Sequence, residues 1–192
     1  EREVAALGVE HEFARTLVDE RDVENPFDIN GLMSSDVALM LFTSGTSGVS
    51  KVACIDHESL CRHTRSLAHE AFAFDATSRV LATLPLCHSF GLRTTLLVSV
   101  AAGASIVLVD RFDAERSLGL AREHGATFLA GVPTMYGDWA SAKLDPVPTL
   151  QWALSAGASL PASVAEEASR ALGAPVYEGY GLTEASFSCI DT

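Results

Sequence analysis

Short apolar segments alternate with segments of helical periodicity from Asp36 to the end of the chain. Residues 106–109, for example, are apolar throughout, which is the composition of a parallel strand covered on both faces. This alternation predicts an α/β fold, a layered and mainly parallel sheet flanked by helices. The predicted strands are residues 37–42, 52–56, 79–84, 104–109, 126–131, 151–155 and 175–178, and the predicted helices are residues 58–73, 89–102, 113–124, 134–142 and 162–172.

Local signals mark the ends of several of these elements. Asp113 is suited to a helix N-cap, and Gly125 and Gly173 are suited to the left-handed residue that follows a helix. In parallel sheets, ligands bind beyond the carboxyl ends of the strands. Five loops follow predicted strands, and we expect them at one edge of the sheet: residues 43–51, 85–91, 132–134, 156–159 and 179–184.

Charge and cysteine content limit the partners of the chain. Its 192 residues include 25 acidic and 13 basic side chains, and the net charge of −12 disfavours nucleic acid as a partner. The 4 cysteines form no Cys-x-x-Cys pair, which is expected of a protein in the reducing cytoplasm. The apolar stretch at residues 94–102 is too short to span a bilayer. We interpret residues 1–35 as a connecting segment and residues 36–192 as a partial α/β domain cut from a longer protein.

Four potential zinc ligands, Cys54, His57, Cys61 and His63, lie close together in the sequence. Their spacing is irregular, and Cys61 and His63 point about 200° apart on a helix. We therefore favour a buried cysteine and surface histidines over a zinc site.

A loop rich in glycine and hydroxyl groups follows the apolar residues 37–41. Glycine lets successive backbone N–H groups converge on an anion, hydroxyl groups add donors, and a lysine adds a positive charge. The spacing is not that of a Walker loop, and such a segment can also be a flexible turn. Because an apolar strand is expected to anchor it in a core, we predict a phosphate-binding loop made by Thr43, Ser44, Gly45, Thr46, Ser47, Gly48 and Lys51.

Four segments, in the same order, resemble motifs of the adenylate-forming superfamily, which includes acyl-CoA synthetases, acyl-carrier-protein ligases and luciferases. Residues 43–51 are similar to its Thr-Ser-Gly-Thr-[Thr/Ser]-Gly-x-Pro-Lys loop, with Ser50 in place of proline and Val52 in place of the following glycine. Residues 84–92 resemble its Pro-Leu-x-His-x-x-Gly segment, and residues 177–184 resemble its Tyr-Gly-x-Thr-Glu segment. Residues 154–160 resemble its Ser-Gly-Ala-Ala-Pro-Leu segment, with Ser159 in place of proline.

The resemblance implies a site for ATP and Mg²⁺. Lys51 and its loop would hold the β- and γ-phosphates, Thr183 would bind the α-phosphate, and Glu184 would ligate Mg²⁺ together with Thr43. Adenine would lie between Tyr180 and the backbone of the 157–158 segment. The implied nucleotide-binding residues after the phosphate loop are Gly157, Ala158, Ser159, Glu178, Gly179, Tyr180, Gly181 and Thr183. From the residues alone, Thr183 and Glu184 could instead open a helix, Tyr180 could be a core aromatic residue, and Gly157 could form an ordinary turn.

The resemblance also implies an acyl pocket. His88 would lie beside the acyl group and control entry of the thiol, and with Lys51, Thr183 and Glu184 it completes the implied catalytic residues. The pocket would be lined by Phe90, Gly91, Val132, Pro133 and Gly181, although plain core packing is the alternative for each of these.

By resemblance, the chain is a fragment of an ATP-dependent carboxylic acid–thiol ligase. It would activate an acid, expected to be a fatty acid, as acyl-AMP and pass it to coenzyme A or to the phosphopantetheine thiol of an acyl carrier protein. The fragment is expected to be inactive, because the ribose-binding aspartate and the C-terminal lysine of the family are not in these residues. The alternatives are a non-catalytic nucleotide-binding module and a serine hydrolase, which the lack of a Gly-x-Ser-x-Gly motif disfavours.

Overall fold

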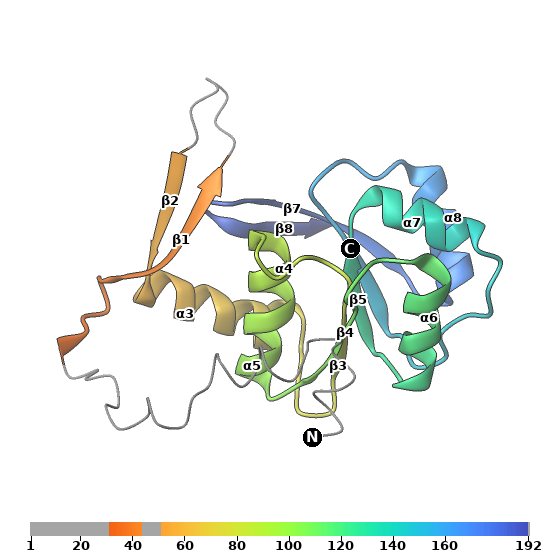
Figure 1. The fold of residues 1–192 in the computed structure, drawn as a ribbon, viewed down its shortest axis with the longest axis horizontal. Helices are drawn as coiled ribbons and strands as arrows, with labels where there is room; N and C mark the ends of the chain where they lie inside the picture. The colour runs from red at the N-terminus through yellow and green to blue at the C-terminus, as the bar shows by residue number, and fades with distance from the viewer. Residues whose placement is uncertain (1–30, 44–50, 192) are drawn as a thin grey trace, which may run out of the picture.

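The computed structural model describes residues 31–43 and 51–191. Their main feature is a six-stranded sheet in the order β4-β3-β5-β6-β7-β8, in which every neighbouring pair is parallel except β7 and β8 (Figure 1). The predicted α/β class and mainly parallel sheet are confirmed. The strands are β3 (Arg79–Ala82), β4 (Ser105–Leu108), β5 (Phe128–Gly131), β6 (Trp152–Ser155), β7 (Val176–Leu182) and β8 (Ser186–Asp191).

Helices cover both faces of this sheet. Figure 1 shows α6, α7 and α8 on one side and α3, α4 and α5 on the other. Leu81 and Leu129 pack in the first core, whereas the preceding residues Val80 and Phe128 pack in the second. Successive residues of a strand point to opposite faces, so the strands are apolar throughout. The helices are α3 (His57–Ser66), α4 (Ser89–Gly91), α5 (Val98–Ala102), α6 (Ala114–Glu123), α7 (Pro133–Ser141) and α8 (Ala162–Leu172).

The predicted helix ends agree with the structure. The Asp113 carboxylate accepts a hydrogen bond from the Arg116 N–H at 2.8 Å, as an N-cap does. Gly125 and Gly173 have φ values of 63° and 76°, in the left-handed region that favours glycine.

Two predicted helices, 58–73 and 89–102, are less regular than expected. π-Helical turns continue α3 as η3 (Leu67–Ala71) and join α4 to α5 as η4 (Leu92–Leu97). Thr94 Oγ1 donates to the Phe90 carbonyl, and Ser99 Oγ donates to the Thr95 carbonyl at 2.6 Å. Hydroxyl groups that bond to the carbonyl four residues earlier distort the helical ladder.

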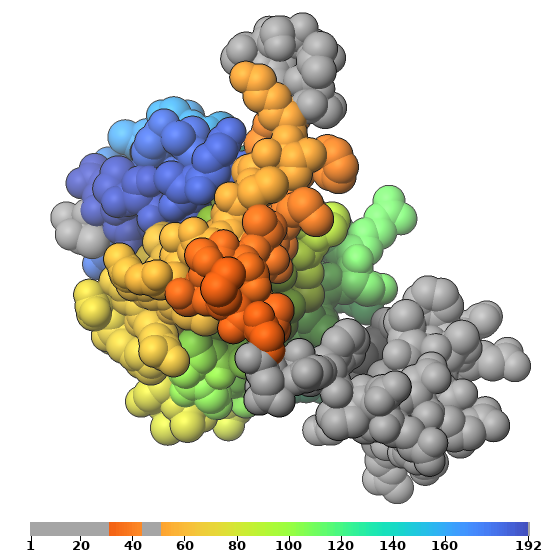
Figure 2. Space-filling model, turned by 90° about the vertical axis from the view of Figure 1, so that its left-hand side faces the viewer, coloured from red at the N-terminus to blue at the C-terminus, as the bar shows by residue number. Residues whose placement is uncertain are grey.

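The first two strands do not belong to the main sheet. β1 (Val37–Thr43) and β2 (Lys51–Asp56) pair as an antiparallel hairpin that stands out from the body of the molecule (Figure 2). The prediction of a buried strand ahead of the phosphate loop is therefore wrong, since Phe42 is 80% exposed and Met40 is 65% exposed. The reason is that α3 packs against the hairpin but no second layer covers it within the described part of the chain.

Candidate functional site

Several of the predicted site loops lie at one edge of the sheet. β3, β5, β6 and β7 are parallel, so the loops that follow them begin at the same edge. This confirms the expected grouping for residues 85–91, 132–134 and 156–159. The predicted phosphate loop is the exception, because β1 lies outside this sheet.

The two described ends of the predicted phosphate loop face each other across the hairpin. Thr43 is the last residue of β1, Lys51 is the first residue of β2, and the two are paired in the strand register. The hairpin thus brings together a hydroxyl and an exposed ammonium group at the base of the loop. Ser44, Gly45, Thr46, Ser47 and Gly48 lie outside the described residues.

His88 caps the helix that opens after β3. Its Nδ1 accepts a hydrogen bond from the Phe90 N–H at 3.2 Å, which leaves Nε2 of this exposed residue as the ring nitrogen for a substrate contact. Gly91 is required by the turn before it, because a Cβ there would lie 2.4 Å from the Pro85 carbonyl oxygen. Gly91 is buried, and its missing side chain lets α4 pack closely against this turn.

The loops after β5 and β6 contact each other. Val132 precedes α7, Pro133 begins it, and both are half-buried. A Cβ on Gly157 would lie 3.6 Å from Val132 Cγ1, so the loops after β5 and β6 touch. Phe90 and Val132 are both partly buried against the same core, so they combine core packing with an accessible surface.

The loop after β6 is held by a carboxylate from β7. Glu178 Oε1 accepts a hydrogen bond from the Leu160 N–H at 3.0 Å. Gly157 has a φ of 89°, and it is exposed together with Ala158 and Ser159. The backbone of the 157–159 segment is therefore open to a ligand, and Glu178 supports it from behind.

The Tyr-Gly-Leu-Thr-Glu segment differs from the loop predicted at residues 179–184. β7 continues to Leu182, and a turn at residues 183–185 connects it to β8, with which it pairs. Sequence analysis did not predict β8. Thr183 and Glu184 lie in this turn, so the alternative that they open a helix is wrong. Glu184 is exposed and Thr183 is half-buried.

The exposed aromatic ring on this hairpin is Tyr180, which is 59% exposed, and the alternative of a core aromatic residue is wrong. The two neighbouring glycines serve packing. A Cβ on Gly179 would lie 1.9 Å from Phe187 Cζ, and one on Gly181 would lie 2.4 Å from the Ser186 carbonyl oxygen. Both contacts come from β8, so these glycines let the last strand lie close to β7.

The described residues offer hard oxygen donors for a metal but no preformed cage. Residues 31–43 and 51–191 contain no group of three or more His, Cys, Asp and Glu side chains that could hold an ion. The Glu184 carboxylate and the Thr43 hydroxyl are ligand types that suit Mg²⁺, which usually binds through one or two carboxylates and substrate phosphates. Their chemistry therefore fits a magnesium ion carried largely by ATP.

The region of the candidate zinc ligands has a different role. All four cysteines are exposed, so the expected buried cysteine is wrong. His63 is half-buried, and its Nε2 lies 2.9 Å from the Phe187 carbonyl oxygen. This hydrogen bond connects α3 to β8. Burial lowers the pKa of His63, partly offset by the hydrogen bond to Phe187, and the positive charge of Arg93 lowers it further. Arg93 itself is buried in η4, and sequence analysis did not single it out.

The chain belongs to the AMP-binding enzyme family, whose model matches residues 4–192. It is 30% identical over 157 residues to the long-chain-fatty-acid–CoA ligase of Bacillus subtilis (strain 168), an alignment that covers 79% of this chain and 28% of the relative. The chain thus spans about a third or less of the length of such relatives.

Solved structures give the same family. The ATP-bound MatB of Rhodopseudomonas palustris superposes with a TM-score of 0.75 at 31% identity, covering 83% of this chain and 32% of that chain. The O-succinylbenzoate coenzyme A synthetase of Bacillus subtilis, in complex with ATP and magnesium, gives a TM-score of 0.74 at 28% identity, covering 84% and 34%. Within the described residues, no helix has the length and apolar character needed to cross a membrane.

Proposed function

We propose that the protein containing this chain joins a carboxylic acid to a thiol at the expense of ATP. The acid would first form an acyl-adenylate with release of pyrophosphate, and the acyl group would then pass to the thiol of coenzyme A. The observation that carries this proposal is the grouping of His88, the exposed 157–159 backbone and the Tyr180–Glu184 hairpin beyond one edge of the sheet. Coenzyme A is favoured as acceptor because it appears in the names of the relatives, and a carrier-protein phosphopantetheine thiol is the alternative.

The reaction brings two anions together, so the residues must offset negative charge. Lys51 would place an ammonium group beside the β- and γ-phosphates as pyrophosphate leaves, and Thr183 would donate to the α-phosphate. Tyr180 would cover one face of adenine and the 157–158 backbone the other. Glu184 and Thr43 would hold Mg²⁺, which supplies positive charge at the phosphates when bound.

His88 would border the acyl group. Its Nδ1 is engaged by the Phe90 N–H, so Nε2 is the atom that can contact the substrate. A ring held in this way can orient the carboxylate and separate the acyl pocket from the thiol path. Phe90, Val132 and Pro133 would contribute apolar surface beside it.

The relatives differ in the carboxylic acid that they activate. The relatives act on acids as different as a long-chain fatty acid and O-succinylbenzoate. A fatty acid therefore remains one candidate within a wider class of carboxylic acids.

Glu184→Gln tests the proposal in the protein that contains the chain. We expect acid-dependent pyrophosphate exchange to fall by on the order of 100-fold, because an amide cannot replace an ionised Mg²⁺ ligand. The exposed Glu167 of α8 supplies the matched control, Glu167→Gln, which should change exchange little. Unchanged exchange in the Glu184 variant would remove this residue from the mechanism. Binding of ATP without exchange for any acid would favour a non-catalytic nucleotide-binding module.

A further inference from the structure

Arg93 is a buried positive charge without a described partner. Arg93 is only 3% exposed, and its Nε and Nη1 atoms have no hydrogen-bond partner among residues 31–43 and 51–191. The ion pairs found in these residues, Arg62–Glu58 and Arg116–Asp110, lie at the surface and do not involve it.

A buried charge in this situation is costly unless an anion meets it. Burial lowers the pKa of the guanidinium, but arginine remains protonated at neutral pH. The neighbouring His63 cannot supply negative charge, and its own buried Nδ1 also lacks a partner in the described part of the chain. The planar guanidinium is suited to donate two parallel hydrogen bonds to one carboxylate.

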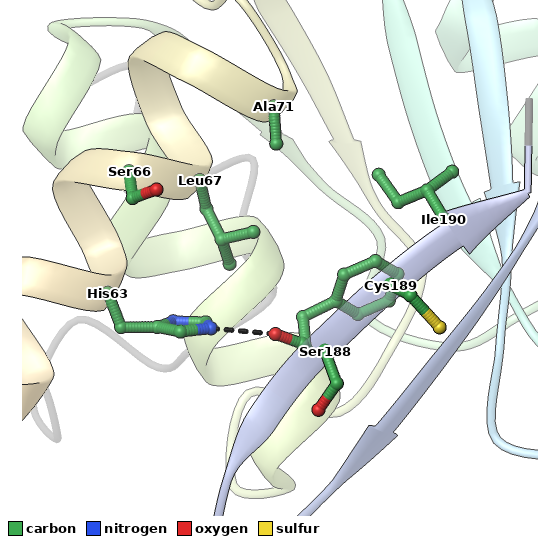
Figure 3. A pocket seen from close by; sticks show the side chains of 8 residues that line it. His63, Ser66, Leu67, Ala71, Ser188, Cys189 and Ile190 are labelled. Carbon is green, nitrogen blue, oxygen red and sulfur yellow. Dashed lines mark hydrogen bonds between the residues drawn. The ribbon is translucent and has the colours of Figure 1, made fainter.

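A groove is lined by His63, the histidine whose pKa the charge of Arg93 affects. A cavity of about 390 Å³ runs between α3–η3 and β8, and His63, Leu67 and Ile190 form part of its wall (Figure 3). His63 connects Arg93 to the groove, because it lines the groove and is close enough to Arg93 for the positive charges of the two side chains to interact. The surface of the groove is mostly apolar, and His63, Ser66 and Ser188 are its polar side chains.

The groove and Arg93 are each connected through a structural element to residues of the proposed acyl site. β8, which lines the groove, pairs with β7 so that Cys189 faces Tyr180 and Phe187 faces Gly181. Arg93 follows Phe90 by one helical turn, on the segment that His88 caps. The side chains of Phe90 and Arg93 are one helical turn apart, so they lie on the same side of this segment.

We propose that the acid substrate carries a second carboxylate, which pairs with Arg93 while the first carboxyl group reacts. The inference rests on the proposed function and narrows it from carboxylic acids in general to dicarboxylic acids. A simple fatty acid would leave the buried guanidinium unpaired, whereas a remote carboxylate neutralises it and sets the depth at which the acid binds.

The test compares diacids with monoacids of equal carbon number, from C4 to C10, in the protein containing the chain. Acid-dependent pyrophosphate exchange gives kcat/KM for each member of a pair, such as adipate and hexanoate. We expect the wild-type protein to favour the diacid, and Arg93→Met to lower the diacid-to-monoacid ratio by on the order of 100-fold. Arg93→Lys keeps the charge but not the two-pronged geometry and should give an intermediate ratio. Arg65→Met, at an exposed position on α3, should leave the ratio unchanged.

A binding measurement separates substrate recognition from a structural role. The preferred diacid, added with a non-hydrolysable ATP analogue, should raise the melting temperature of the wild-type protein and not that of Arg93→Met. If Arg93→Met melts lower and the ratio is unchanged, Arg93 pairs with a carboxylate of the protein itself and the inference is overturned. If monoacids react better than diacids in the wild type, the proposed function stands and the inference fails. If no acid supports exchange, the proposed function fails with it.

Discussion

At the scale of single residues, two glycines of one motif serve to bring strands together. Gly179 and Gly181 face β8 so closely that any side chain would collide with it. A motif that resembles a nucleotide loop is therefore also a packing device, and the exposed residues beside the glycines, Tyr180 and Glu184, are the ones free to meet a ligand.

Gly179→Ala should destabilise the fold. Its Cβ would lie 1.9 Å from Phe187 Cζ, and Phe187 is itself buried, so the ring cannot move aside freely. We expect a loss of about 1–3 kcal/mol in the free energy of unfolding, the usual cost of overpacking. Denaturant unfolding monitored by circular dichroism measures it.

Gly119→Ala is the matched control, because a Cβ at this position in the middle of α6 would meet nothing within 4 Å. The same added methyl group should there stabilise the helix by about 0.5–1 kcal/mol. Equal effects at both positions would mean that Phe187 does not restrict Gly179.

At the scale of secondary-structure elements, a single histidine joins α3 to β8. Burial lowers the pKa of His63 below its ordinary value of about 6.5, since the contribution of its hydrogen bond to Phe187 does not outweigh burial and the charge of Arg93. As the pH falls through this value, the unfolded chain takes up the proton before the folded one. The stability associated with neutral His63 is therefore complete above about pH 6.5 and declines below it.

His63→Gln should weaken this pH dependence, because glutamine can donate to the Phe187 carbonyl but does not titrate. Melting temperatures between pH 5 and pH 8 should fall less steeply toward acid in the variant than in the wild type. His69→Gln, at an exposed position in η3, serves as the control and should follow the wild-type curve. Identical acid slopes in His63→Gln and the wild type would show that His63 is not the responsible group.

The elements also show how far sequence patterns reach. The buried parallel strands and the helix ends at Asp113 and Gly173 follow from local composition, so they could be predicted. Two similar apolar strands, β1 and β3, ended in different sheets, because composition does not say which strands pair. β8 was missed although Ser186–Asp191 begins with the polar–apolar alternation of a half-buried strand, because the span is short and its pairing depends on the fit of Phe187 against Gly179.

The candidate site also contains residues that the sequence predicts and one that only the folded structure shows. His88, the 157–159 loop and Glu184 could be predicted because the motifs that they belong to are local in sequence. Arg93 could not, since its significance depends on burial and on the lack of a described partner, which arise only when η4, α3 and β8 pack together. The only sequence signal was a lone arginine in an apolar and hydroxyl-bearing helix.

At the scale of the whole molecule, the net charge of −12 opposes any anionic ligand. The proposed ATP site must therefore attract the nucleotide through nearby donors while the rest of the chain repels it. Salt separates the two contributions, because the screening length falls from about 10 Å at 0.1 M to about 3 Å at 1 M. Long-range repulsion should disappear at high salt, whereas direct contacts should weaken but persist.

Lys51→Ala tests how much local attraction at the proposed site offsets the repulsion of ATP by the rest of the chain. We expect the variant to bind Mg²⁺–ATP about tenfold more weakly than the wild type at 0.1 M salt, because a charge-assisted contact is lost. The difference should narrow at 1 M salt, as screening weakens the attraction that only the wild type has. Lys143→Ala, which removes a charge from an exposed position outside the site, should bind like the wild type at both concentrations. Titration calorimetry at the two salt concentrations gives all six affinities, and a Lys51→Ala variant that binds as tightly as the wild type would show that the base of the β1–β2 loop does not contact the phosphates.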